Sequence, residues 1–429
     1  MLLLFKRVGR VAAGVLLTVA LPSFGGEAVS TDLRSYLDTV LQAHPELKAA
    51  DARVAAAQAQ AEALSRPIYN PQLDLGAERN QSQTFSAGLS QTIDLSGKRT
   101  ARRASGSAEL ATAIAERTTQ RQTIATEILK TLAELYGRIA AASLAQQRLE
   151  LLERFAEVAE RQYKAGDIGV LDRDLAALAR AEAIALTGRA ELELLKAQQA
   201  LDAATRRPGF PPPGLPDQLP ESGRLRMDYD ALAAALPSVR SAMARREAAR
   251  AEIAIARSQT RVDPTLGLRG GTEQDHSGRN AEALIGLQVS IPLFLRNNFK
   301  AEVAAADAKA SAAGIEAEAG YGLAVARMKA AATQYGRTYA AWQHWTALSS
   351  ARIDASVELL DKVWRVREIS TAEYLVQFRQ LLDGRAAGEE LRAQTWASWA
   401  EWLDASGLWQ AWLDATQASL STPTAPTGN

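Results

Sequence analysis

Two stretches of the chain, 71–95 and 264–295, alternate apolar side chains with small or polar ones. Alternation with a period of two predicts β-strands with one apolar face, and each stretch divides into two such strands around a polar turn. The second strand of each has about the length, roughly 9–11 residues, that a membrane-crossing strand needs. The side chains predicted to face lipid are Phe85, Leu89, Ile93, Ile285, Leu287, Val289, Ile291 and Leu293.

Two hairpins supply four strands, and four strands cannot close into a barrel. An open sheet edge inside lipid would leave backbone N–H and C=O groups without partners. If these strands enter a membrane, the pattern therefore predicts that several chains share one barrel.

The remainder of the chain is helical in pattern, and the pattern occurs twice. A first repeat at 29–207 and a second at 228–420 both read as helix, hairpin, long helix, turn and returning helix. Shorter helices are expected at 31–65 and 229–258, long helices at 100–163 and 298–363, and returning helices at 171–206 and 371–406, with turns at 164–170 and 365–371. Leucines at three-, four- and five-residue steps in the first long helix favour coiled-coil packing, and such a repeat outweighs any local motif. The sequence predicts a mixed α+β membrane protein, made mainly of long coiled-coil helical hairpins plus two β-hairpins, with an internal twofold repeat.

Helix lengths support this arrangement. At 1.5 Å per residue, a 60-residue helix spans about 90 Å, close to the length of two shorter helices placed end to end. We therefore expect the shorter helices to run alongside the long ones, with a hairpin at one end and a turn at the other.

Segments at the two ends and in the middle of the chain lack the helix and strand patterns of the two repeats. Residues 1–28 have the charged start, apolar centre and small residues of a secretory signal peptide. Six prolines between 208 and 220 make 208–227 a linker or an extended strap, and the tail 421–429 is expected to be disordered.

Composition narrows the function classes. The chain has no cysteine, which excludes disulfides and thiolate chemistry, and its 49 basic residues balance 49 acidic ones, which gives no hint of nucleic-acid binding. We find no phosphate loop, nucleophile motif or paired metal ligands around His44, His276 or His344. The sequence predicts no enzyme activity, no cofactor and no metal site.

The mature chain resembles the TolC family of outer-membrane efflux ducts. The duplicated hairpins and the two turns, YKAGDIGVLDRDL and WRVREISTAEYL, carry the likeness. The second turn departs from the family pattern, with Trp364 in place of Tyr, Arg367 in place of Gly and Glu373 in place of Asp. The sequence LSQTIDLSGKRTARR is similar to the heavy-metal branch, the CzcC-like proteins, in which the second strand often ends in Gly-Lys-Arg.

The resemblance implies an assembly and a location. It implies a homotrimer with a 12-stranded barrel in the outer membrane of a Gram-negative bacterium, continued by a helical tunnel through the periplasm. Its partners would be a periplasmic adaptor and an inner-membrane proton-driven pump of the RND type, with heavy-metal cations as the expected substrate. The tip that closes the tunnel and meets the adaptor would comprise Tyr163, Gly166, Asp167, Ile168, Gly169, Asp172, Trp364, Arg367, Ile369, Ser370 and Glu373.

Three groups of residues have two interpretations each. Asp172 and Glu373 either form carboxylate rings that favour cations or only cap the returning helices. The basic residues after the hairpins either hold the barrel at the membrane interface or begin ordinary solvated helices; these are Lys98, Arg99, Arg102, Arg103, Arg296 and Lys300. Five tryptophans between 396 and 412 fit one helical face packed against the tunnel better than a membrane girdle.

Other functions stay open at this point. A duct of the same fold for drugs, organic solutes or secreted proteins shares every feature above. A secreted coiled-coil stalk that conducts nothing is a further alternative, although a stalk has no need of lipid-facing hairpins.

Overall fold

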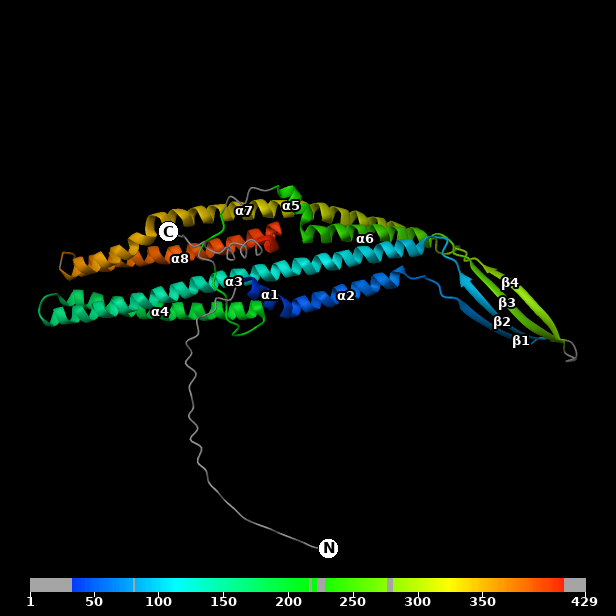
Figure 1. Cartoon of the computed structure of the whole chain (residues 1–429), viewed down its shortest axis with the longest axis horizontal. Helices are drawn as coiled ribbons and strands as arrows, with labels where there is room; N and C mark the ends of the chain where they lie inside the picture. The colour runs from blue at the N-terminus through cyan, green and yellow to red at the C-terminus, as the bar shows by residue number, and fades with distance from the viewer. Residues whose placement is uncertain are drawn as a thin grey trace, which may run out of the picture.

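A computed structural model of the chain describes residues 33–79, 82–215, 218–221, 228–275, 281–366 and 368–412. The predicted signal peptide and C-terminal tail lie outside these residues. Figure 1 shows a long rod with a β-sheet at one end and, at the other end, the two turns that connect the long helices to the returning helices.

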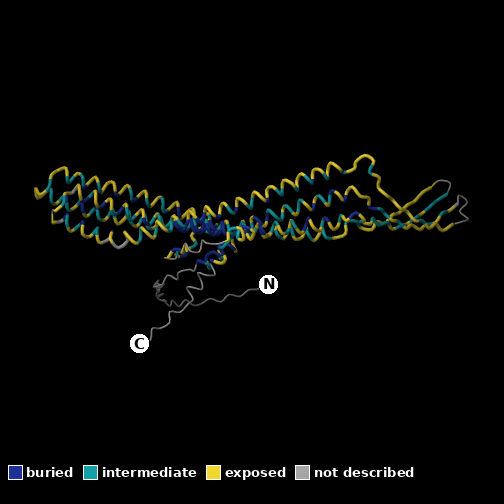
Figure 2. Tube along the Cα trace, turned by 90° about the horizontal axis from the view of Figure 1, so that it is seen from above, coloured by how far each residue is buried: buried dark blue, intermediate teal, exposed yellow. Residues whose placement is uncertain are grey.

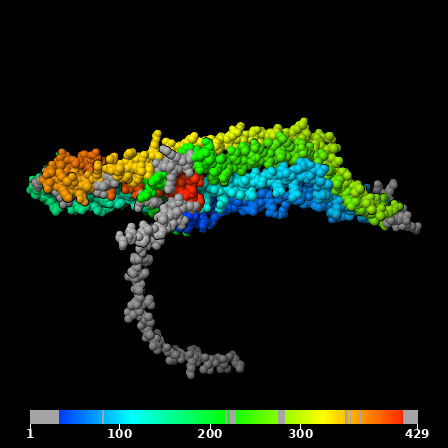
Figure 3. Space-filling view, turned by 45° about the horizontal axis from the view of Figure 1, so that its top comes forward, coloured from blue at the N-terminus to red at the C-terminus, as the bar shows by residue number. Residues whose placement is uncertain are grey.

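Two helices extend along the helical part of the rod. α3 (Lys98–Lys164) and α7 (Lys300–Arg365) have 67 and 66 residues, which corresponds to about 100 Å each. The shorter helices are α2 (Pro45–Ser65), α4 (Val170–Thr205), α6 (Pro237–Gln259) and α8 (Thr371–Ser406). As the lengths predicted, α2 and α4 lie one after the other beside α3 (Figure 1). Figure 3 shows the pair α6 and α7 beside the pair α2 and α3, and the two pairs meet where α6 contacts α3.

The expectation of one continuous helix at 31–65, and of another at 229–258, is wrong. α1 (Leu33–Ala43) ends before Pro45, where His44 takes an extended conformation, and α5 (Tyr229–Ala235) ends before Pro237, where Leu236 does the same. Proline disfavours a helical conformation in the residue before it, yet fits the first turn of the helix that follows. The residues around each proline favour helix, so the sequence pattern by itself predicts one continuous helix at each place.

The four strands form one antiparallel sheet in the order β1-β2-β3-β4. They are β1 (Gln72–Arg79), β2 (Ser82–Thr92), β3 (Thr265–Asp275) and β4 (Ala281–Ser290). The central pair β2 and β3 joins the two hairpins over eleven residues, from Ser82 opposite Asp275 to Thr92 opposite Thr265. A helix-rich chain with four strands was predicted, and this part of the fold class is confirmed.

The strands are shorter than predicted. β2 ends at Thr92 and β4 at Ser290, so Ile93, Ile291 and Leu293 lie beyond the strand ends. Pro292 cannot donate to a ladder, and the N–H of Ile93 bonds to the carbonyl of Pro264 where the chain leaves the sheet.

The main core lies near the middle of the rod, where Figure 2 shows the buried residues gathered. α1, α5 and the ends of α4, α6 and α8 close around the centres of α3 and α7 there. All five C-terminal tryptophans are buried in this core (Trp396, Trp399, Trp402, Trp409 and Trp412). Their packing into a core is therefore confirmed, whereas their position beside a tunnel stays a prediction. A second core near the turns joins α3, α4, α7 and α8.

The proline-rich segment packs against the main core as a strap. Phe210 stacks on Tyr36 with ring centroids 5.0 Å apart, and the Tyr136 hydroxyl donates to the Pro213 carbonyl at 2.9 Å. Leu219 is buried. The described residues of 208–227 therefore form an extended strap packed on the core, rather than a free linker.

Candidate functional site

One face of the sheet is apolar and exposed. Leu73, Leu89, Leu268 and Leu287 stand opposite one another, one from each strand, and their exposed fractions lie between 57% and 85%. A continuous row of exposed leucines is unfavourable in water and marks a surface that meets lipid or a partner.

Five of the eight residues predicted to face lipid lie on this face and are exposed: Phe85, Leu89, Ile285, Leu287 and Val289. Ile93, Ile291 and Leu293 are exposed as well, but beyond the strands. Contact of these side chains with lipid stays a prediction.

The opposite face carries small and polar residues around one arginine. Arg269 on β3 stands between Gly88 on β2 and Gly286 on β4. A Cβ at Gly88 would lie 2.9 Å from the Arg269 Cβ, and a Cβ at Gly286 would lie 3.0 Å from its Nε. The two glycines leave the space that the arginine side chain occupies. The same face also carries carboxylates, since Asp74 stands in the row of Arg269 and Glu78, Glu273 and Glu282 follow at even spacing along their strands.

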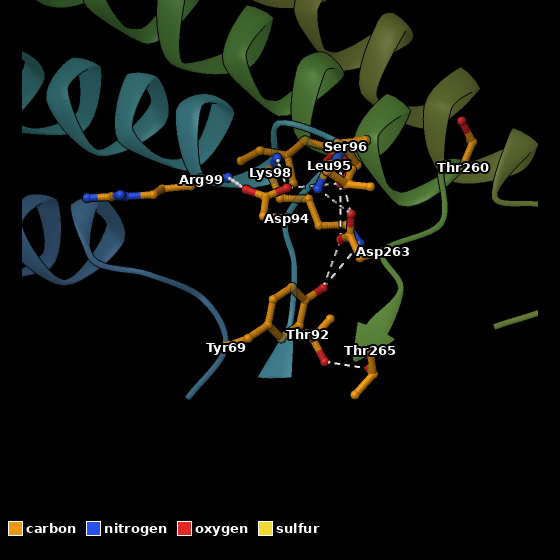
Figure 4. A network of polar contacts seen from close by, with 12 residues as sticks. Tyr69, Thr92, Asp94, Leu95, Ser96, Lys98, Arg99, Thr260, Asp263 and Thr265 are labelled. Carbon is orange, nitrogen blue, oxygen red and sulfur yellow. Dashed lines mark hydrogen bonds and ion pairs between the residues drawn. The ribbon is translucent and has the colours of Figure 1, made fainter. Parts of the chain in front are cut away.

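A polar network joins the sheet to the helices (Figure 4). Asp263, just before β3, has a side chain only 3% exposed and an ion pair of 2.7 Å to Lys98 at the start of α3. Its carboxylate also accepts hydrogen bonds at 3.1 Å from the Tyr69 hydroxyl, the Ser96 hydroxyl and the backbone N–H groups of Leu95 and Ser96. One buried carboxylate therefore ties three segments far apart in sequence.

These contacts set the protonation of the network. Burial by itself raises the pKa of Asp263, but the hydrogen bonds from Lys98, Ser96 and Tyr69 outweigh it and hold the pKa below its ordinary value. Burial likewise lowers the pKa of Lys98, but its bonds to Asp263 and Tyr69 outweigh that effect and raise it. The pair is fully ionised at neutral pH.

A second carboxylate begins α3. Asp94 accepts from the backbone N–H groups of Lys98 at 3.0 Å and Arg99 at 2.8 Å, which gives the first turn of the helix partners for its free donors. Gly97 between them has φ 77°, a left-handed conformation that glycine adopts without steric cost.

The Lys98 ammonium is bound within the network and its side chain is 19% exposed, and its role at the membrane interface stays a prediction. Arg99 donates to the Ser65 carbonyl at 2.8 Å and thereby links the start of α3 to the end of α2. Arg102 is half-buried, and Arg103, Arg296 and Lys300 are exposed. A role of the latter residues at the interface stays a prediction.

Sequence reasoning missed Asp263 and Tyr69. Asp263 and Pro264 precede the second hairpin as Asn70 and Pro71 precede the first, and this match was a usable signal. The hydrogen bonds themselves span 165 to 194 residues along the chain, so no local pattern contained them.

The turn between α3 and α4 reverses the chain at Gly166, where φ is 82°. The N–H of Asp167 reaches back to the Gln162 carbonyl at 2.8 Å, a bond that caps the helix end. Arg173 lies over the Tyr163 ring, 4.4 Å from its centroid, and pairs with Asp174 at 2.7 Å. Arg173 is therefore engaged with its own chain rather than with the predicted tip carboxylates.

The turn between α7 and α8 has a similar backbone, because the N–H of Glu368 bonds to the Val363 carbonyl at 3.1 Å. Ser370 and Glu373 form a capping box: the Ser370 hydroxyl accepts from the Glu373 N–H, and the Glu373 carboxylate accepts from the Ser370 N–H. The Ser370 backbone N–H, and after it the Ser370 hydroxyl, donate to the Glu373 carboxylate and lower its pKa. The capping interpretation therefore holds for Glu373.

The remaining tip residues divide between core and surface. Trp364 is buried and its ring lies 4.3 Å from that of Phe155, while Ile168 and Ile369 pack against the same core. The carboxylate of Asp172 is half-buried and makes no hydrogen bond among the described residues. Arg367 lies outside the described residues, and a gating role for any of these side chains stays a prediction.

Metal ligands and membrane helices can be assessed for the described part of the chain. Within it, no three His, Cys, Asp or Glu side chains are grouped to hold a metal ion. None of its helices is both long and apolar enough to span a membrane.

Sequence comparison identifies relatives of this chain. Residues 36–205 match the family model "Outer membrane efflux protein". The chain is also 28% identical over 255 residues to the cobalt-zinc-cadmium resistance protein CzcC of Cupriavidus metallidurans, a match that covers 54% of this chain. The chain spans about half the length of this relative, 56%. The predicted resemblance to the TolC family and its heavy-metal branch is confirmed by these matches.

Structural comparison extends the likeness of fold to most of the chain. The outer membrane protein VceC of Vibrio cholerae has a TM-score of 0.71 at 21% identity, covering 87% of this chain and 96% of VceC. CusC, described for the conformational changes of its folding and transmembrane channel formation, has a TM-score of 0.72 at 14% identity, covering 88% and 92%.

Proposed function

We propose that the whole chain is one protomer of a trimeric duct in the outer membrane of a Gram-negative bacterium, and the match of residues 36–205 to the outer membrane efflux protein model supports this. Three copies of the four-stranded sheet form a 12-stranded barrel, and the helices continue it as a tunnel in the periplasm. The two similar halves of the chain are an internal repeat that supplies two hairpins to this barrel. The CzcC-like match supports export of heavy-metal cations.

The observation that carries this proposal is the sheet. Within the described residues β1 and β4 each have one neighbour, so the sheet has two free edges beside a row of four exposed leucines. In lipid, backbone groups at such edges require partners, and an edge strand of another copy supplies them. Closure by copies of the same chain also puts Arg269 and the small polar residues inside, where water fills the barrel.

The arrangement of the helices supports a conducting duct rather than a stalk that conducts nothing. The four-helix layer begins directly at the sheet, fixed there by Asp263, and ends in two turns that each have a backbone hydrogen bond across the end of the long helix. We propose that these turns meet a periplasmic adaptor, which couples the duct to an inner-membrane pump of the RND type driven by protons. The duct itself binds no nucleic acid, and selection of the ion belongs to the pump.

Assembly is tested through the sheet edges. Because the chain contains no cysteine, one cysteine placed in β1 and one in β4 are the only thiols, and a short bismaleimide should link neighbouring protomers into dimers and trimers. The single-cysteine variants are the controls, since each can give no more than a dimer. A chain that inserts into bilayers as a monodisperse monomer would falsify the shared barrel.

The substrate is tested in cells. Deletion of the gene should lower tolerance of cobalt, zinc or cadmium salts, and the intact gene should restore it. Unchanged metal tolerance with lowered tolerance of drugs or detergents would overturn the metal assignment and leave a duct for organic solutes.

A further inference from the structure

A cavity of about 260 Å³ lies where α3, α4 and α8 meet. It borders the core near the turns, to which its lining residue Leu382 belongs and against which Leu144 packs. All of its lining residues belong to these three helices of one chain, so the site is complete without a second copy.

Most of the cavity wall is apolar. Leu144, Leu186 and Leu382 come from the three different helices, and alanines fill the space between them. This wall suits a short hydrocarbon or aromatic group, which gains free energy by leaving water.

One end of the cavity is positively charged, and its key donor has no partner. The Nε of Arg148 is buried and makes no hydrogen bond within the described residues. Asp383 forms an ion pair of 3.7 Å with the Nη1 atom of Arg148, which is beyond hydrogen-bond length and leaves the Nε without an acceptor among the described residues. Since the guanidinium is always charged and its side chain is only 13% exposed, a buried donor is left unsatisfied at a cost.

The other charges of the wall leave this donor available. Arg138 is held by Glu134 at 2.6 Å on its own helix, and Glu193 is bound by Lys196 at 2.7 Å. Arg189 adds a further positive charge to the rim. Three arginines and two carboxylates line the wall, and among these groups the Nε of Arg148 offers an anion one buried, charge-assisted hydrogen bond.

From this geometry we propose that the cavity binds a small amphipathic organic anion, with its carboxylate accepting from the Nε of Arg148 and its apolar chain lying among Leu144, Leu186 and Leu382. Such a ligand contacts α3, α4 and α8 together and so links the two helical hairpins on the tip side of the main core. This site is independent of conduction through the duct.

The test uses the full chain in phosphatidylcholine nanodiscs and a series of eight-carbon probes that differ only in the head group. We expect isothermal titration to give octanoate a dissociation constant roughly ten- to a hundredfold lower than octanol or octylammonium, because only the carboxylate satisfies the charged donor. Empty nanodiscs give the contribution of the lipid, which is subtracted.

Three variants locate the binding. Arg148→Gln should reduce the preference for octanoate to within about threefold of octanol, and Ala190→Leu should abolish binding of the whole series by filling the cavity. Arg154→Gln is the matched control, because Arg154 is an exposed arginine further along α3 whose Nε bonds to the Glu150 carbonyl. Far-UV circular dichroism and particle size establish that each variant keeps the fold.

Three results overturn the proposal. Equal affinity for all three probes means an apolar slot without anion recognition, and absence of octanoate binding means no ligand site. Retention of the preference in folded Arg148→Gln places the anion elsewhere. None of these results bears on trimer assembly or metal tolerance, so they are separate from the tests of the proposed duct.

Discussion

Replacing Asp263 by alanine should loosen the connection between the sheet and the helices more than any surface substitution. The change removes the acceptor of five hydrogen bonds, including those of the Leu95 and Ser96 amides, and leaves the Lys98 ammonium without its carboxylate. Loss of one partner of a buried ion pair costs about 3–5 kcal/mol. Because Lys98 is 19% exposed and can gain water, we expect the lower end, about 3 kcal/mol.

The size of this effect can be measured locally. A loss of about 3 kcal/mol corresponds to a roughly hundredfold greater population of the open junction. Hydrogen exchange of the extracted assembly, read by mass spectrometry on peptides containing Leu95 and Ser96, should therefore speed up by about that factor. The apparent melting temperature should fall as well.

A matched control separates the junction from surface charge. Asp51 pairs with Arg117 on the helices, with both side chains well exposed, and such a pair contributes roughly 0.2–1 kcal/mol. Asp51→Ala should change exchange near the junction little. If Asp263→Ala proved as mild as Asp51→Ala, the network would not be what holds the sheet to the helices.

The same network predicts a pH dependence. Because the folded-state pKa of Asp263 lies below its unfolded value, its contribution is present above the unfolded pKa, about 3.9, and is lost as the pH falls through the folded value. The contribution of Lys98, whose pKa is raised, is present below its unfolded pKa and is lost as the pH rises through the folded one. The protection factor of the Leu95 amide, the exchange rate of the unfolded chain divided by its own at the same pH, should therefore be constant between pH 5 and 8 and decrease in acid. Asp263→Asn should reduce that acid dependence, and the part that remains belongs to Asp94, whose pKa is also lowered.

The remaining predictions concern the sheet and the tip. Leu287→Arg should impair membrane assembly by roughly 2–4 kcal/mol if the residue faces lipid, whereas Gln288→Arg on the other face should insert and change single-channel conductance; the reverse ranking would shift the register by one residue. Gly271→Ala should destabilise the extracted assembly by about 1–3 kcal/mol, because a Cβ there would overlap the Phe85 carbonyl oxygen, while Gly270→Ala should be mild in the same thermal assay. Ser370→Ala should cost about 1 kcal/mol in helix stability and leave ion selectivity in planar bilayers unchanged, since this residue caps α8.

Local patterns in the sequence were sufficient for the elements and for their faces. Alternation around Leu89 and Leu287 marks strands because side chains of a strand point to opposite faces in turn. The lengths of α3 and α7 followed from uninterrupted helix formers bounded by turn residues. Ser370 and Glu373 stand at the spacing that a capping box requires, which made the capping interpretation available from the chain alone.

The two prolines Pro45 and Pro237 determine where the predicted shorter helices break, despite the helix-forming residues around them. Pro45 and Pro237 divide the two predicted shorter helices because the residue before each must leave the helical conformation. The short helices α1 and α5 result, and both pack into the main core. The positions of both breaks are therefore encoded in the sequence by the prolines, although the neighbouring residues favour a continuous helix.

Only the tertiary structure decided how the two halves meet. Pairing of β2 with β3, the ion pair of Lys98 with Asp263 and the burial of Arg148 beside Asp383 all join residues more than 150 positions apart. A basic residue at a helix start gives the same sequence pattern whether it faces membrane, water or a buried carboxylate. The sequence determines its charge, but the folded surroundings determine which group it pairs with. Contacts of this kind depend on the position of both segments in space, which no local pattern encodes.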